Sequence, residues 1–256
     1  MIPQHIDTEL SKDLGSLWHE LRGGLWHRTA SHRFRQIHAA GKIDPNPVLD
    51  AREWLWATAN GGTTCCRAMN GVSLFDFGEA DWKQAFEADG EPWRAWSAFL
   101  MAPEREIPAD KWTATIWLQL ARSQLSGLVP VPEVSARRKA MLVEVACMQK
   151  WMDGIEACHI GAIPLAACTK ALVVCAVETN EFQILDAPID VSAIDHIESH
   201  WRERFAKGYL IRSLPLHEAI KHIDWSSFER PTGRPTEDEL HTRLQEARAR
   251  LADKGN

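Results

Sequence analysis

The segment LWHRT at residues 25–29, followed by SHRFRQIHAA at residues 31–40, decides how the rest of the chain is interpreted. Apolar residues open it and a polar pair follows them, which predicts a short strand over Leu25–His27. The ten residues after it predict one amphipathic helix, because Phe34 and Ile37 are three apart and share a helix face. We expect Ser31 to cap the start of this helix, and Gly41 to take the left-handed conformation after its end.

His27 and Thr29 are the candidate binding residues of this segment. Side chains two apart on a strand point the same way, so both can reach one bound molecule. A histidine that is merely hydrogen-bonded to backbone fits the same pattern. Two later segments, GVSLFDF at residues 71–77 and GIEACHIGAIPL at residues 154–165, favour the binding interpretation.

Taken in chain order, the three segments resemble the ADP-ribosyltransferase fold superfamily. The context of Glu156, an acid followed by apolar residues and then Ile-Pro-Leu, is most similar to the DarT-like branch. The resemblance covers roughly residues 22–180. It implies an α+β fold, with a split β-sheet core flanked by helices, and NAD as co-substrate. The roles that it implies are NAD binding by His27 and Thr29, the middle-strand position for Ser73, stacking on nicotinamide by Phe75 or Phe77, and catalysis by Glu156.

Glu156 suits the reaction that the resemblance implies. Breaking the bond between nicotinamide and ribose develops positive charge on the sugar, as in glycoside hydrolysis. A carboxylate beneath the ring can hold a ribose hydroxyl and stabilise that charge. Nicotinamide is a good leaving group, so we expect no metal. Glu178 and Glu181 are competing carboxylates, but neither has the flanking pattern of Glu156.

One position departs from the better-known members of the superfamily. Many protein-modifying members carry a second acid or a glutamine two residues before the catalytic glutamate. Gly154 occupies that position here, directly after Asp153. The resemblance therefore points away from arginine modification, and toward a nucleic-acid base, another side chain or water as the acceptor.

Charge is unevenly distributed along the chain. The net charge is −6, which argues against broad non-specific binding of nucleic acid. Residues 22–67 nevertheless carry seven Lys/Arg against three acids. Arg28 and Arg67 are candidate ligands for the pyrophosphate of NAD. A solvated basic face is the alternative interpretation.

Composition predicts a soluble cytoplasmic protein without a membrane span. The chain has 256 residues, no apolar run of membrane-spanning length, and an N-terminal sequence that lacks the features of a signal peptide. Six cysteines occur without a C-x-x-C motif, and most lie in apolar runs, which favours reduced core thiols. The twelve tryptophans are expected to pack in the core.

We expect a catalytic domain at residues 1–187 and a helical C-terminal extension packed on it at residues 188–256.

The remaining pattern predicts alternating elements. The expected strands are Val72–Phe77, Trp112–Leu120, Glu156–Ile160 and Ala171–Val177. The expected helices lie within residues 1–24 and at Asp81–Ala102, Ser135–Trp151, Val191–Ala206, Pro215–His222 and Thr236–Leu251.

Three alternatives from other classes remain open. The first is a metal-dependent hydrolase built on Cys158, His159 and one of His196 or His200, which are four apart on an expected helix. The second is a member of the same fold that is non-catalytic or that hydrolyses NAD, or a binding module for a protein partner. The third is transfer of an RNA 2′-phosphate to NAD, which the presence of Glu156 argues against.

Overall fold

The computed structural model describes residues 2–45, 47, 65–87, 114–141, 154–176 and 181–206. The chain divides into two compact units, residues 1–210 and 211–256, and every described residue belongs to the first. The expected helices at Pro215–His222 and Thr236–Leu251 therefore lie outside the described residues. So does most of the C-terminal extension, whose boundary at residues 187/188 stays a prediction.

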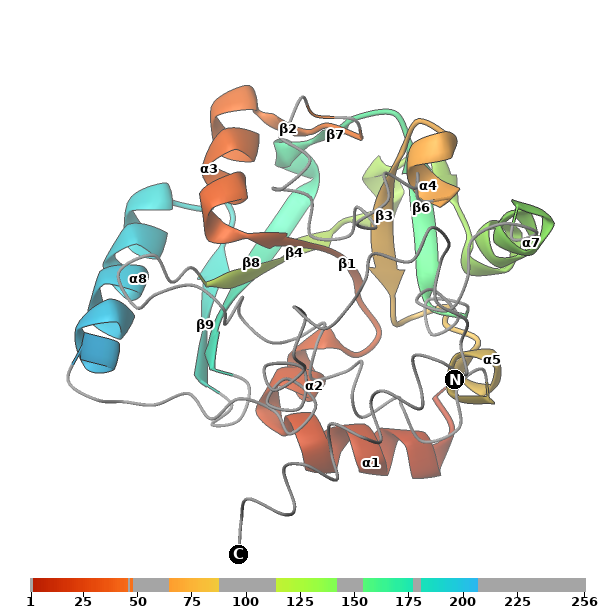
Figure 1. Ribbon diagram of the computed structural model, residues 1–256, viewed down its shortest axis with the longest axis horizontal. Helices are drawn as coiled ribbons and strands as arrows, with labels where there is room; N and C mark the ends of the chain where they lie inside the picture. Colours follow the sequence, from red (N-terminus) through yellow and green to blue (C-terminus); the bar gives the residue numbers. More distant parts are fainter. Residues whose placement is uncertain are drawn as a thin grey trace, which may run out of the picture. The chain divides into compact units, whose positions relative to one another are not determined.

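Seven antiparallel strands form one large sheet in the order β5-β6-β3-β1-β4-β8-β9 (Figure 1). Their bounds are β1 Leu25–Ala30, β3 Gly71–Asp76, β4 Thr115–Leu120, β5 Leu128–Val129, β6 Glu156–Ile160, β8 Cys168–Ala176 and β9 Glu181–Asp186. A second small sheet pairs β2, Lys42–Ile43, with β7, Ile163–Pro164. The three segments singled out in the sequence form β1, β3 and β6, which are adjacent in the large sheet.

Strand β1 joins the two halves of the large sheet. It pairs with β4 over five residues, Trp26–Ala30, but with β3 over only two, Leu25 and Trp26. Beyond Trp26 the ladder between β1 and β3 ends, and His27 is the first residue past that point. The side chain of His27 therefore lies where the β5-β6-β3 half stops pairing with the β4-β8-β9 half.

Helices cover both faces of the sheet. On one face, α3 (Ser31–Ala40) and α8 (Val191–Ala206) contribute Phe34, Ile194, Ile197 and Trp201 to a core shared with Leu25, Leu74 and Leu118. On the other face, α1 (Gln4–Leu14), α2 (Ser16–Leu21) and α5 (Trp82–Glu87) pack on a core shared with Trp26, Phe75 and Trp117. The fold is thus α+β, with a large antiparallel sheet flanked by helices, as the sequence predicts.

Two further helices complete the arrangement near β3 and β6. Helix α4 (Cys65–Ala68) contacts both strands, and helix α7 (Val131–Met141) contacts β6 and α4. Short 3-10 turns lie at Arg122–Gln124 and Leu165–Ala167. No helix among the described residues has both the length and the apolar content that a membrane crossing requires.

Several elements match the sequence predictions closely. Strand β6 and helix α8 have the predicted bounds, and Gly41 ends α3 in the left-handed conformation with a φ of 66°. The segment within residues 1–24 is helical, as predicted, but the helix is interrupted at Gly15, whose φ is 53°. Strand β9 and the small β2-β7 sheet were not predicted.

Two predictions about helix starts are wrong. Ser31 does not cap α3: it is the first helical residue, and its hydroxyl donates to Glu198 instead. Helix α7 begins at Val131 rather than at Ser135, because the carbonyl of Pro130 already accepts the amides of Glu133 and Val134. Ser135 therefore lies inside the helix, where its hydroxyl oxygen accepts the amide of Gly154 at 3.3 Å.

Candidate functional site

Ser73 connects the three segments that carry the predicted site residues. Its hydroxyl donates to the Oε1 atom of Glu156 on the neighbouring strand β6. Its carbonyl oxygen lies 3.2 Å from Nδ1 of His27 on β1. Since a carbonyl can only accept, Nδ1 carries the proton and the other ring nitrogen is left as an acceptor. Two successive hydrogen bonds thus bring His27, Ser73 and Glu156 together.

The register of the sheet explains which side chains share a face. Phe75 is directly opposite Glu156, and Ser73 is opposite Cys158, so these four side chains lie on the same face of β3 and β6. Trp26 pairs with Phe75, which places Trp26, and by alternation Arg28, on that face too. His27 belongs to the other face, and it reaches the edge of β3 only because the ladder between the two strands ends at Trp26.

His27 is neutral at ordinary pH. The pKa of His27 is lowered from 6.5 to about 4, chiefly by burial among protein atoms; the hydrogen bond to Ser73 opposes this shift, and the charge of Arg28 adds to it. The side chain keeps intermediate exposure to solvent. A neutral ring that donates through Nδ1 can accept a hydroxyl through Nε2.

The carboxylate of Glu156 is buried and paired with a cation. Its residue is 4% exposed, and Oε2 forms an ion pair with the guanidinium of Arg138, which is 2% exposed and comes from α7. Arginine remains charged at all ordinary pH values, so the ion pair favours the ionised carboxylate. Ser73 and Arg138 occupy one oxygen each.

Gly154 leaves no room for a side chain two residues before Glu156. Its φ is +93°, and a Cβ atom there would lie 2.5 Å from the carbonyl oxygen of Asp81 and 2.8 Å from the amide nitrogen of Ala85. Both are backbone atoms, which cannot move aside as the end of a side chain can. The turn that precedes β6 thus gives a steric reason why position 154 carries glycine and not a second acid or a glutamine.

The other predicted site residues lie near these three, in different surroundings. Thr29 is 4% exposed and shares a face with His27, as expected, while Arg28 is 9% exposed. Phe75 is 4% exposed, and its ring meets that of Trp117 edge-on at 5.1 Å, which is a core contact. Arg67 is at the end of α4, which packs against β3 and β6. The roles assigned to these residues in NAD binding stay predictions.

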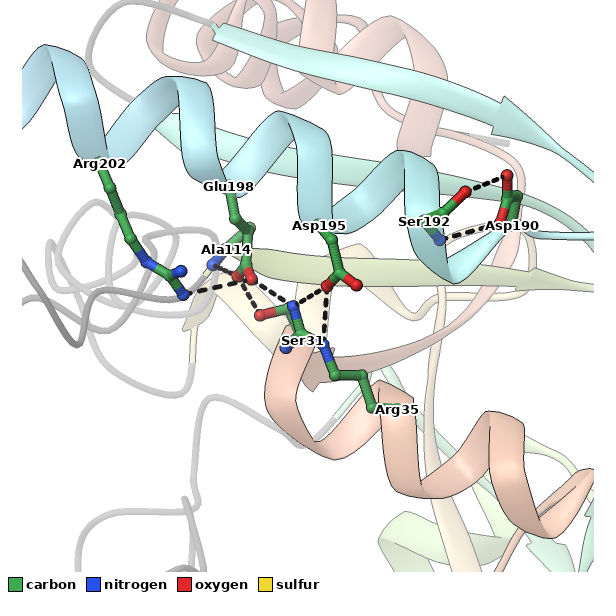
Figure 2. A network of polar contacts seen from close by, with 8 residues as sticks. All are labelled: Ser31, Arg35, Ala114, Asp190, Ser192, Asp195, Glu198 and Arg202. Atoms are coloured by element: carbon green, nitrogen blue, oxygen red, sulfur yellow. Dashed lines mark hydrogen bonds and ion pairs between the residues drawn. The ribbon is translucent and has the colours of Figure 1, made fainter.

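A second buried carboxylate lies on the opposite face, between α3 and α8. Glu198 is 0% exposed; its Oε1 accepts the hydroxyl of Ser31 and the amide of Ala114 at 2.8 Å. Its Oε2 pairs with Arg35 at 2.5 Å and with Arg202 at 3.5 Å. Figure 2 shows these groups converging from α3 and α8, with Asp195 also bound to Arg35. Burial acts to lower the pKa of Arg35, but the bonds to the two carboxylates outweigh it and raise that pKa.

The two buried carboxylates differ in what they can still bind. A carboxylate offers about four acceptor positions. Glu198 has four donors around it, which accounts for its full capacity and makes it a structural link between α3, α8 and the residue that precedes β4. Glu156 has two partners among the described residues, Ser73 and Arg138. Glu156 is therefore the one of the two that can accept further hydrogen bonds from a ligand.

The residues of the metal-dependent alternative are not brought together. His196 and His200 are exposed on α8, whereas Cys158 and His159 are buried on β6. No group of three His, Cys, Asp or Glu residues within the described part of the chain has metal-binding geometry. The thiols of Cys158 and Cys66 instead share a hydrogen bond. This hydrogen bond lowers the pKa of Cys158 and raises that of Cys66. All five described cysteines are buried thiols rather than members of disulfides, as the sequence predicts.

Sequence reasoning missed Arg138 and Glu198, although a signal for both was present. Val131, Val134, Ser135 and Arg138 are spaced i, i+3, i+4 and i+7, which is the buried stripe of α7. Ile194, Ile197, Glu198 and Trp201 repeat that spacing on α8. A charged residue inside a helical apolar stripe indicates a buried ion pair, because a lone charge would be too costly to bury.

Comparison of the chain with protein-family models, with curated proteins and with solved structures found no match.

Proposed function

We propose that this protein is an NAD-dependent mono-ADP-ribosyltransferase that transfers ADP-ribose to a macromolecular acceptor, a nucleic acid or a protein. The observation that carries the proposal is the convergence of the three resembling segments on Ser73. His27 bonds to its carbonyl and Glu156 to its hydroxyl, although these residues are 46 and 83 positions away in the chain. Glu156 is, moreover, a buried carboxylate whose two partners among the described residues leave acceptor positions for a ligand.

The proposed reaction begins with cleavage of the bond between ribose C1′ and the nicotinamide nitrogen. The electron pair of that bond goes to nicotinamide, which leaves as a neutral molecule, and positive charge develops on the ribose. Glu156 accepts a hydrogen bond from a ribose hydroxyl and stabilises this charge through its own negative charge. The nucleophile of the acceptor then bonds to C1′ and releases its proton to solvent.

His27 has a binding role in this proposal. Its free ring nitrogen accepts a hydroxyl of the adenosine ribose, as the resemblance implies, and its neutral state suits that task. The end of the β1-β3 ladder supports this arrangement, since a ligand there can meet His27 from one face of the sheet and Glu156 from the other. Because the backbone around Gly154 excludes a second acid, the acceptor must supply a nucleophile that needs no activation from that position.

The test measures nicotinamide release from labelled NAD by the purified protein, and transfer of labelled ADP-ribose to separate pools of protein, DNA and RNA. Glu156→Gln keeps the shape of the side chain and removes its charge. We expect it to slow nicotinamide release by about 10² or more, while NAD still raises the melting temperature. Glu198→Gln is the matched control, because it also removes a buried carboxylate from an arginine. It should keep the wild-type rate per folded molecule.

One observation favours a second candidate, a non-catalytic NAD-binding member of the same fold. Glu156 is 4% exposed and already paired with Arg138, which is the environment of a structural ion pair. Under that hypothesis NAD raises the melting temperature of the wild type but no nicotinamide is released with any acceptor pool. An unchanged melting curve at millimolar NAD would count against both candidates.

A further inference from the structure

Arg138 is a charged residue on the buried face of helix α7. Its neighbours in sequence, Arg137 and Lys139, are exposed, and Arg137 pairs with Glu133 at the surface. Arg138 instead points to β6, where its guanidinium meets Glu156 and both groups are almost without solvent contact. Removing two charges from water is costly, so an apolar pair of similar volume would serve stability as well.

We propose that Arg138 is a positioning residue for the nicotinamide-releasing reaction, acting through Glu156. This inference rests on the function proposed above. Arg138 holds Oε2 of Glu156 while the hydroxyl of Ser73 holds Oε1, so the carboxyl group is fixed at both oxygens. The remaining acceptor position of Oε1 then has a defined direction in which a ribose hydroxyl can approach.

Arg138 also keeps Glu156 ionised in a place that would otherwise favour its neutral form. A carboxylate with little solvent contact takes up a proton more readily unless a cation lies beside it. A protonated Glu156 has no charge with which to stabilise the developing ribose cation. The guanidinium supplies the compensating charge.

The planar fork of arginine matters as well as its charge. Arginine presents fixed N–H donors to a carboxylate, whereas the ammonium group of lysine is a compact point charge on a flexible stem. Arg138→Lys therefore retains the charge and loses the geometry, while Arg138→Gln loses both. The two substitutions separate the two parts of the proposed role.

The experiment measures the pH profile of nicotinamide release and the NAD-induced rise in melting temperature for the wild type, Arg138→Lys, Arg138→Gln and Arg137→Gln. Arg138→Gln should lower the rate at pH 7.5 by about tenfold or more and move the acid limb of the profile to higher pH. Arg138→Lys should lower the rate several-fold without moving that limb. The surface control Arg137→Gln should match the wild type in both measurements.

Each outcome decides the proposal. Arg138→Gln and Arg138→Lys could both have lower melting temperatures yet release nicotinamide at the wild-type rate per folded molecule, with an unchanged pH profile. In that case Arg138 is structural and the proposal is overturned. If Arg138→Gln does not fold, Arg138→Lys alone decides, since a wild-type rate in that variant contradicts positioning. A wild-type protein that releases no nicotinamide overturns the proposed function and this inference together, which distinguishes that failure from a failure of Arg138 alone.

Discussion

His27 should make the stability of the folded protein depend on pH in a defined window. The unfolded chain takes up a proton on His27 as the pH falls through 6.5, whereas the folded protein does so only near pH 4. Between these values the unfolded state binds more protons, so lowering the pH destabilises the folded state. The stabilisation that the neutral ring of His27 contributes is fully present above pH 6.5 and is lost as the pH falls toward 4.

The size of this effect follows from the two pKa values of His27, 6.5 unfolded and about 4 folded. At 1.36 kcal/mol per pKa unit, their difference corresponds to at most about 3 kcal/mol of unfolding free energy. The ring is only half-buried, so water reduces the burial penalty and the measured effect should be smaller, about 1–2 kcal/mol.

Urea unfolding at pH 7.5, 6.5, 5.5 and 4.5 measures this contribution when the wild type is compared with His27→Gln. Glutamine can donate to the carbonyl of Ser73 and does not titrate, so the wild type should lose about 1–2 kcal/mol more than the variant between pH 7.5 and 4.5. His200→Gln, at an exposed position on α8, should keep the wild-type pH dependence. Parallel curves for the wild type and His27→Gln would refute the assignment of a neutral, half-buried His27 with a lowered pKa.

Two further predictions concern folding stability. Glu198→Gln should lower the unfolding free energy by about 1.5–3 kcal/mol, since it replaces the buried charged acceptor of a hydrogen-bond network with a neutral amide. Asp195→Asn, at an exposed partner of Arg35, should cost less than about 1 kcal/mol. A loss of similar size in both variants, measured by chemical denaturation, would contradict a special role for Glu198. Gly154→Ala should cost about 2–5 kcal/mol, because it adds backbone clashes to left-handed strain. Gly41→Ala has the strain alone, with nothing within 4 Å of the new Cβ, and should cost about 1–2 kcal/mol; equal thermal shifts for the two would disprove the steric argument.

The elements with the clearest periodicity were predictable from sequence. Helix α8 and strand β6 were predicted to the residue, because an apolar stripe and a β-rich run are local properties. The start of α7 was not, since the carbonyl of Pro130, rather than the serine at position 135, begins its first turn. Strand β9 was missed because it is an edge strand with exposed side chains and lacks a buried apolar pattern.

The candidate site, too, was predictable only in part from the sequence. The residue types at positions 27, 73 and 156 were recognisable as a group, and their strands are adjacent. The partners of these residues were not recognisable, since the contact of Arg138 with Glu156 depends on how α7 packs against β6. The steric exclusion at Gly154 likewise depends on the turn around Asp81, which is distant in sequence.

The order of strands in the large sheet has a consequence for how the molecule folds. The bond between Ser73 and Glu156 spans 83 positions, and the bond between Ser31 and Glu198 spans 167. Contacts of such long range are slow to form, because the entropy of closing the chain is lost before the contacts stabilise it. During synthesis β3 emerges long before β6, and α3 long before α8. We therefore expect the bonds of Ser73 to Glu156 and of Ser31 to Glu198 to form late in folding.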